Sequence, residues 1–223
     1  MAKQEIKQEQ VLNMEEAVSR SEAFINKNKK VISAIVAAII VVVAAGMLIS
    51  TFVVKPREQK AAEALFVGEK YFQNGDYETA LNGDQEYAGF EAVASEFKGT
   101  KAANLAKAYA GISLAKLGRY EEAIPMLKAF KGNDVMVAPS VLAALGNCSV
   151  QVGNEAQAAS TLVKAAAKAD NNLLSPAYLI QAGQIYEKLG KKADALKVYT
   201  EIKTKYYGSM QAMDIDKYIE RVK

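Results

Sequence analysis

Four segments of this 223-residue chain share one spacing of small residues, and that regularity constrains the fold more than any other feature. Each segment begins with glycine, has a second glycine seven residues later, and has an alanine five residues after that. The segments are GEKYFQNGDYETA (68–80), GISLAKLGRYEEA (111–123), GNCSVQVGNEAQA (146–158) and GQIYEKLGKKADA (183–195). Their starts lie 43, 35 and 37 residues apart, a period typical of stacked helix pairs that bury a shared core.

This pattern resembles the tetratricopeptide repeat, a helix pair of about 34 residues. The resemblance implies that the first glycine of each segment lets helix A pack closely on helix B, that the second ends helix A in the left-handed region, and that the alanine lets the pair close. It also assigns the large residue of helix B to Leu127, Leu162 and Tyr199. We therefore predict an all-α fold: a tetratricopeptide-like helix-pair solenoid of about four repeats over residues 55–223.

Two parts of this region depart from the period. Removing Leu81–Gly89 from the first repeat restores a 34-residue spacing, so we expect an inserted surface loop there. The acidic residues Asp84 and Glu86 lie in it, but the spacing of a calcium-binding loop is missing. At the other end, the apolar residues of Ser209–Val222 recur with helical periodicity, which predicts a C-terminal capping helix.

An uncharged run of 24 residues, Val31–Val54, precedes the repeats. As a helix it is about 36 Å long, against about 30 Å for the hydrocarbon core of a bilayer. Thirty residues precede the run and no small-residue cleavage site follows it, so it does not resemble a cleaved signal peptide. We predict a single transmembrane helix over residues 31–54, and a short tail over residues 1–30.

The flanking charges predict the orientation of this helix. Basic residues are slightly more numerous on the N-terminal side, where Lys27, Lys29 and Lys30 lie at the membrane edge, so we expect a cytoplasmic N-terminus and a translocated repeat domain. The tail contains a predicted amphipathic helix that begins at Asn13, with Met14, Val18, Ser21 and Ile25 on one face. That helix either binds a partner or the membrane surface, or only sets the topology.

Composition excludes most catalytic chemistry. The chain has no histidine and a single cysteine, so it offers no imidazole base, no internal disulfide and no zinc site built from these residues. A net charge of +3 gives no nucleic-acid footprint. We expect no enzymatic activity, no cofactor, no metal and no small-molecule substrate.

A binding surface is the remaining expectation. In tetratricopeptide folds the concave face is lined by helix A, and the mixture of amide, charged and apolar groups there suits an extended peptide or a partner helix. Carrying the repeat frame over gives these candidates: Glu69, Phe72, Gln73, Ile112, Lys116, Asn147, Gln151, Gln184, Glu187 and Lys188.

The whole layout of tail helix, uncleaved anchor and tetratricopeptide domain resembles the YfgM-type ancillary subunits of the SecYEG translocon. That resemblance implies an inner-membrane protein with a periplasmic repeat domain. Its implied partners are the SecYEG channel, a PpiD-type periplasmic chaperone and newly translocated client polypeptides. The alternative is an anchored tetratricopeptide adaptor that assembles a different membrane or envelope complex, with its repeats in the cytoplasm.

Overall fold

A computed structural model describes the backbone of residues 2–223 and the side chains of residues 26–223. Within that range the chain is all-α, and no strand occurs among residues 2–223, as the sequence predicts. The chain divides into two compact units, residues 1–56 and 57–223.

The first unit is one long helix. Helix α1 (Ala2–Ile49) continues into a π-helical turn, η1 (Ser50–Val54), and the backbone stays helical through α2 (Lys55–Gln73). Helix formers such as Lys, Gln and Glu fill residues 2–12, so the expected helix start at Asn13 is wrong. The side chains of residues 2–25, including the predicted apolar face of the tail, lie outside the described part of the chain.

The π turn lies where proline would otherwise disrupt an α-helix. Pro56 has no N–H, and its ring would clash with the carbonyl group four residues earlier. The turn Ser50–Val54 ends just before this proline, and the N–H of Lys55 donates to the oxygen of Ser50, five residues back. The wider turn therefore carries the helix past Pro56 without an interruption.

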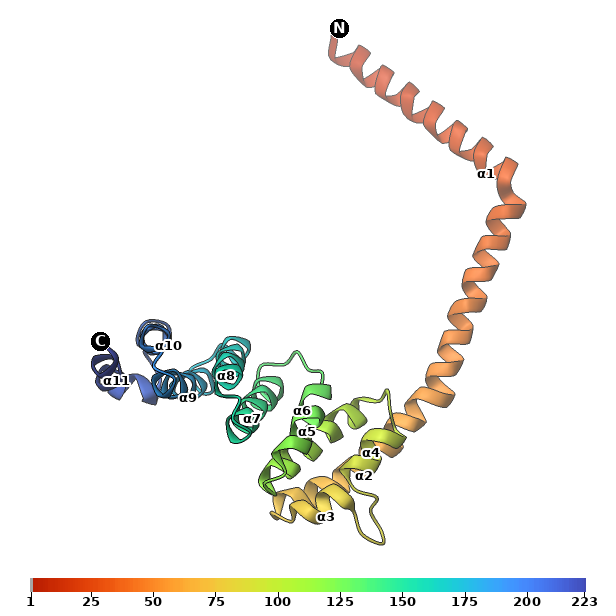
Figure 1. Ribbon diagram of the computed structural model, residues 1–223. Helices are drawn as coiled ribbons and strands as arrows, with labels where there is room; N and C mark the ends of the chain where they lie inside the picture. The colour runs from red at the N-terminus through yellow and green to blue at the C-terminus, as the bar shows by residue number, and fades with distance from the viewer. Residues whose placement is uncertain (1) are drawn as a thin grey trace. The chain divides into compact units, whose positions relative to one another are not determined.

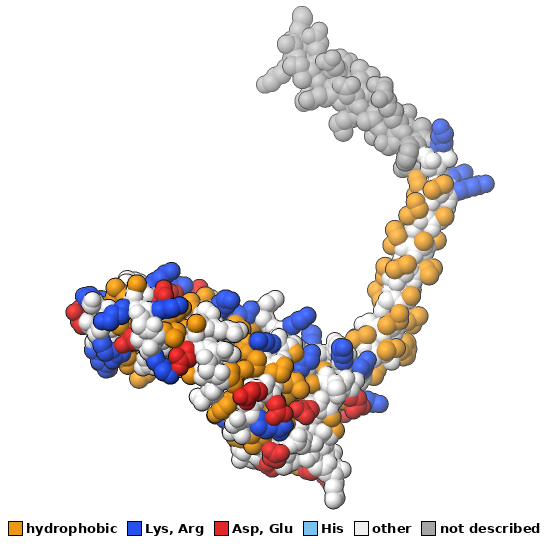
Figure 2. All heavy atoms as spheres, viewed as in Figure 1, with side chains coloured by type: hydrophobic (Ala, Val, Ile, Leu, Met, Phe, Trp, Pro, Cys, Tyr) orange, Lys and Arg blue, Asp and Glu red, His pale blue; other side chains and the backbone are white. Residues whose placement is uncertain are grey.

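No residue of the apolar segment of this helix, residues 31–54, is buried. The helical stretch 26–73 includes an 18-residue window of mean hydropathy 2.9, none of it buried, so one helix of the chain is long and apolar enough to span a membrane. On the face seen in Figure 2, hydrophobic side chains cover this segment between two groups of basic side chains.

The second unit is a stack of antiparallel helix pairs (Figure 1). The first pair joins α2 to a broken partner, α3 (Tyr77–Asn82) and α4 (Phe90–Glu96). The next pairs are α5 (Lys101–Lys116) with α6 (Tyr120–Ala129), α7 (Val137–Gln151) with α8 (Glu155–Ala169), and α9 (Ser175–Lys188) with α10 (Lys192–Lys205). A 3₁₀ turn, η2 (Met210–Asp214), and α11 (Ile215–Val222) end the chain.

Glycine allows the two helices of each pair to pack closely. A Cβ added at Gly183 would lie 2.3 Å from Cε1 of Tyr199, so the aromatic ring rests directly on the backbone of α9. Leu127 and Leu162 occupy the same place against Gly111 and Gly146. The four repeat alanines are fully buried, and the four turn glycines have positive φ angles between 71° and 80°, as the repeat pattern predicts.

The insertion in the first repeat is more than a surface loop. Gly83 and Gly89, both with positive φ, close its neck, and Tyr87 turns back into the core, where its hydroxyl donates to the oxygen of Ala80. The rings of Tyr87 and Phe90 lie against Gly68, the place that Leu127 takes in the next repeat. The inserted segment thus supplies the large residue that the interrupted repeat lacks.

The C-terminal helix closes the core, as predicted. Ile215, Ile219 and Val222 of α11 are buried against α10, and Tyr218 packs beside Tyr199 with ring centroids 5.3 Å apart. The opposite side of this helix is charged, so it covers the apolar end of the stack and presents a polar surface to water.

We predict that Gly183→Ala destabilises the protein more than Gly146→Ala does. At Gly183 the new methyl group meets a buried ring, whereas at Gly146 it meets a leucine side chain 2.9 Å away that can shift. Overpacking costs about 1–3 kcal/mol, and alanine recovers about 1 kcal/mol of helix propensity. Urea unfolding of the full chain in detergent, followed by circular dichroism, measures both variants. Equal midpoints would contradict this packing account.

Candidate functional site

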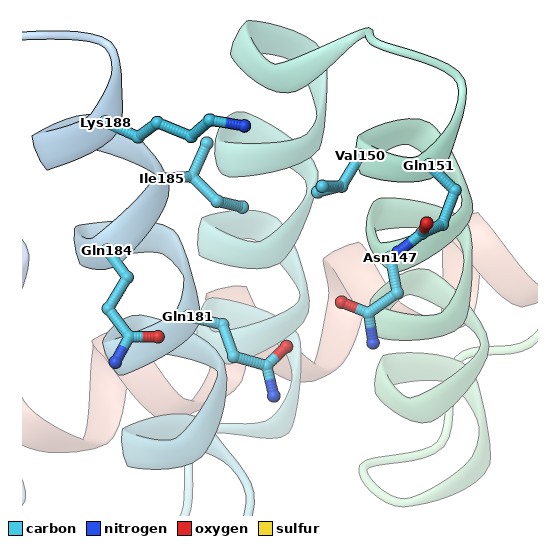
Figure 3. A pocket seen from close by; sticks show the side chains of 7 residues that line it. All are labelled: Asn147, Val150, Gln151, Gln181, Gln184, Ile185 and Lys188. Carbon is cyan, nitrogen blue, oxygen red and sulfur yellow. The ribbon is translucent and has the colours of Figure 1, made fainter.

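Two adjoining hollows lie along the A helices of the second unit. One, of about 380 Å³, lies between α7 and α9 (Figure 3), and the other, of about 610 Å³, lies between α5 and α7. Both are lined by Asn147 and Gln151, so they join across α7. We call the pair of hollows the groove.

Side-chain amides dominate the hollow between α7 and α9. Asn147 and Gln151 come from α7, and Gln181 and Gln184 come from α9. Figure 3 shows Gln181 extending from α9 toward α7, and Asn147 extending back toward α9. The Oε1 atom of Gln181 is buried and accepts no hydrogen bond from the described residues. A buried acceptor without a partner costs about 1–3 kcal/mol, so a ligand that donates to it would recover that energy.

The remaining lining is apolar with a basic rim. Val150 and Ile185 face the hollow from the two helices (Figure 3). Lys188 lies at the rim, where its Nζ forms an ion pair with Glu155 at the start of α8. The partly exposed pair leaves the groove close to neutral there, so the site favours a neutral polar ligand over a strongly charged one.

Six of the ten candidate residues line the groove. They are Ile112, Lys116, Asn147, Gln151, Gln184 and Lys188. Each of them follows a repeat glycine by one or five residues. At about 100° per residue, such positions lie roughly 100–140° around the helix from the glycine, away from the paired helix B. Their role in binding stays a prediction.

The three candidates on α2 line neither hollow. Phe72 packs into an aromatic cluster with Tyr77, Phe90 and Tyr109, with ring centroids 5.1–6.5 Å apart. Glu69 lies beside the hydroxyl of Tyr109, whose pKa rises to about 12 mainly because of burial and also because of this carboxylate. Gln73 is exposed at the end of α2.

Glu187 holds the capping helix. Its carboxylate accepts two hydrogen bonds from Arg221 of α11, both 2.7 Å, and one of 2.5 Å from the hydroxyl of Tyr199. The Arg221 guanidinium is the main cause of a lowered pKa for this carboxyl. Glu187 follows Gly183 by four residues, about 40° around the helix, and its hydrogen bonds place it against α10 and α11.

Sequence reasoning missed Gln181, Val150 and Ile185. The repeat frame assigns groove positions only from each glycine toward the C-terminus, whereas Gln181 precedes Gly183 by two residues. It lies about 160° from that glycine, and it precedes Gln184 by three residues on the same face. The i, i+3 spacing of the two glutamines is the signal in the sequence that could have identified it.

The described part of the groove offers little reactive chemistry. No group of three or more Asp, Glu, Cys or His side chains within residues 26–223 is arranged to hold a metal ion. Cys148 lines the α5–α7 hollow but is 1% exposed, and burial raises the pKa of its thiol, so the nucleophilic thiolate is disfavoured. The arrangement suits hydrogen bonding and apolar contact.

We predict that Glu187→Gln lowers the free energy of unfolding by about 1 kcal/mol at neutral pH, because charge-assisted hydrogen bonds to α11 are lost. The folded pKa of this carboxyl lies below its ordinary 4.5, so its contribution is present above that pH and is lost as pH falls through the folded value. The variant should therefore show a shallower loss of stability below about pH 4.5 in urea titrations.

The matched control is Glu220→Gln, which removes an exposed pair with Lys223. We expect it to change stability by less than about 0.5 kcal/mol. An unchanged pH profile for Glu187→Gln would show that the contact to Arg221 does not stabilise the cap.

Comparisons with known proteins agree with this geometry. A family model described as a tetratricopeptide repeat matches residues 176–203, the α9–α10 pair. A crystal structure of nearly identical TPR-like repeats from a Podosopora anserina protein named a kinesin light chain matches with a TM-score of 0.53 and 13% identity, over 74% of this chain and 85% of that one. No curated protein matches the sequence. The second unit is therefore a tetratricopeptide-like solenoid, a fold that points to a protein–protein interaction scaffold.

Proposed function

We propose that this chain is a non-enzymatic, membrane-anchored scaffold whose groove binds an extended stretch of a partner polypeptide. The observation that carries the proposal is the buried, unpartnered Oε1 of Gln181 in a hollow lined by three further side-chain amides. An extended main chain presents one N–H and one C=O per residue, at intervals of about 3.3 Å. Side-chain amides match both groups, because each offers two donors and an accepting oxygen.

The nearly neutral character of the hollow between α7 and α9 supports a broad choice of partner sequence. Hydrogen bonds to the main chain do not depend on the side chains of the ligand, and Val150 and Ile185 add apolar contact of low specificity. A groove of this kind suits clients that are not yet folded, because their backbone groups are still free.

The more specific proposal concerns the place of this scaffold in the cell. Its tail (residues 1–30) is cytoplasmic, residues 31–54 cross the bacterial inner membrane, and the repeat domain (residues 55–223) is periplasmic. Its partners are the SecYEG translocon, a PpiD-type chaperone and newly translocated polypeptides. The resemblance to YfgM-type subunits and the basic residues before the apolar segment support this. Tethering beside the channel raises the local client concentration, so weak binding in the groove is enough.

The alternative is an anchored adaptor with its repeats in the cytoplasm. The observation against it is the small excess of basic residues before the apolar segment. Within fifteen residues on either side, four basic residues precede the segment, and only Lys55, Arg57 and Lys60 follow it.

The topology is tested by fusing reporters after Lys223. We expect alkaline phosphatase, which is active only outside the cytoplasm, to be active, and a fluorescent protein that matures only in the cytoplasm to be dark. Within fifteen residues on either side of the apolar run, four basic residues precede it and three follow it, which favours this orientation. The reverse pair of results would reject the periplasmic assignment and support the adaptor.

The groove is tested by photo-crosslinking and pull-down from gently solubilised membranes. We expect a photo-reactive residue at Gln184 to capture partner polypeptides. We expect the double variant Gln151→Ala/Gln184→Ala to recover about thirtyfold less partner, since two lost hydrogen bonds of about 1 kcal/mol each weaken binding by about 2 kcal/mol. The matched control is Gln157→Ala, at an exposed glutamine of α8 that lines neither hollow.

Mass spectrometry of the recovered proteins tests the partners separately. Translocon and chaperone subunits should co-purify with the unchanged chain. If partners appear but none belongs to the translocon, the scaffold survives and the Sec assignment is rejected. Equal recovery by the double variant and the control would reject the groove as the binding site.

A further inference from the structure

The loops that connect successive repeats lie along one edge of the second unit. Hydrogen bonds or ion pairs link the start of α2 to the end of α4 and the start of α5 to the loop between α6 and α7. They also link the end of α8 to that same loop, and the end of α10 to the loop between α8 and α9. The linked residues are Arg57–Glu96, Asn104–Lys131, Lys168–Asn133 and Lys205–Asp170. We call the loops 130–137, 170–174 and 206–213 the anchor-side edge, because Arg57, the first residue of the second unit, lies at the same edge.

This edge carries most of the exposed large apolar side chains of the second unit. They are Val135, Met136, Val137, Leu173, Tyr207, Met210 and Met213. Met210 and Met213 are 84% and 85% exposed, more than any other large apolar side chain described. The turns of the opposite edge expose none in the described residues, and the two others, Phe66 and Val67, lie in the middle of α2. The asymmetry between the two edges shows that the exposure is not random.

The charges of the anchor-side edge favour an anionic surface. Its acidic side chains are occupied within the fold: Asp134 caps α7 with bonds to the N–H groups of Met136 and Val137, and Asp170 pairs with Lys205. Glu96, at the end of α4 on the same edge, is the exception, because its exposed carboxylate forms no ion pair in the described residues. Four exposed lysines lie in or beside the loop 130–137 or the connection between α4 and α5 at the same edge, and their ammonium groups have no partner in the described structure. They are Lys98, Lys101, Lys128 and Lys131.

A hollow of about 600 Å³ opens beside the loop 130–137. Lys128, Lys131 and Lys168 stand around it, and Phe130, Val141 and Leu142 line its apolar part. Cationic groups around an apolar floor match the headgroup boundary of an anionic lipid, where phosphate and the first methylene groups lie together.

We infer that the anchor-side edge rests on the surface of an anionic bilayer, with Met210, Met213 and Tyr207 inserted at the headgroup boundary. The inference rests on the proposed anchoring of the chain, since the anchor holds this edge near lipid and makes weak insertion effective. Flexible methionines and an amphipathic tyrosine suit an irregular interface, and the lysines meet lipid phosphates. The opposite edge, with its glycine turns, faces water.

Because the chain contains no tryptophan, a single introduced tryptophan reports this contact directly. The full chain is reconstituted in vesicles of phosphatidylcholine with about one third phosphatidylglycerol, and a second set contains lipids brominated on their acyl chains. Met210→Trp and Val135→Trp test the edge, and Ala156→Trp, at an exposed residue next to the Gly153 turn, is the control. Both leaflets have the same composition, so the orientation of insertion does not affect the reading.

We expect Met210→Trp and Val135→Trp to emit at shorter wavelength than Ala156→Trp and to lose about half of their emission in brominated vesicles. Lys128→Glu/Lys131→Glu, or vesicles of phosphatidylcholine alone, should weaken that quenching. Circular dichroism confirms that each variant is folded. Because these positions are exposed, substitution leaves the core intact.

Flotation of the vesicles separates the failure of this inference from that of the anchor. If the chain does not float with the vesicles, the anchoring proposal is overturned, and the edge contact with it. If the chain floats but Met210→Trp is as unquenched as Ala156→Trp, only the edge contact is overturned. Emission at shorter wavelength without quenching by brominated lipid would show that a protein covers the edge, and would also overturn the inference.

Discussion

The contact between a glycine of helix A and a large side chain of helix B is the constraint on which the second unit depends. In each pair the side chain lies on bare backbone, from Tyr87 and Phe90 on Gly68 to Tyr199 on Gly183. This contact fixes the rotation of every A helix about its own axis. The residues about 100–160° away from the glycine then face the groove. At about 40°, Phe72 and Glu187 contact the neighbouring helices, whereas Val150 lines the hollow between α7 and α9. The groove is therefore a consequence of how the pairs close.

The same rotation explains which site predictions agree with the geometry. Asn147, Gln151, Gln184 and Lys188 follow a glycine by one or five residues and line the hollow between α7 and α9. Phe72 and Glu187 follow a glycine by four residues, and the structure places both against neighbouring helices. An angle measured from each glycine, applied in both directions along the helix, would have excluded these two and included Gln181, but it would also have excluded Val150, which lines the hollow at the same angle as Phe72 and Glu187.

The fold was predictable because its signals are local and repeated, whereas the exceptions depend on contacts between distant residues. Four glycines, four turns and four alanines specify the pairs, and the structure confirms each of them. That Tyr87 of the insertion replaces the missing core residue, or that Pro56 is preceded by a π turn, follows from which groups meet in space. The two candidates on helix α2 at groove-facing angles, Glu69 and Gln73, line neither of the two hollows, and aromatic rings pack between α2, α4 and α5 beside them.

The antiparallel pairing has a further consequence for a tethered solenoid. Each repeat contains two helices, so the chain returns after every repeat to the edge at which it began. An apolar helix that leads into the first A helix therefore joins the solenoid at the edge of the inter-repeat loops, never at the edge of the glycine turns. Sequence changes in those loops, such as the exposed methionines of η2, do not disturb the glycine contacts that hold the stack. The groove and the anchor-side edge are thus free to acquire separate binding properties on one rigid core.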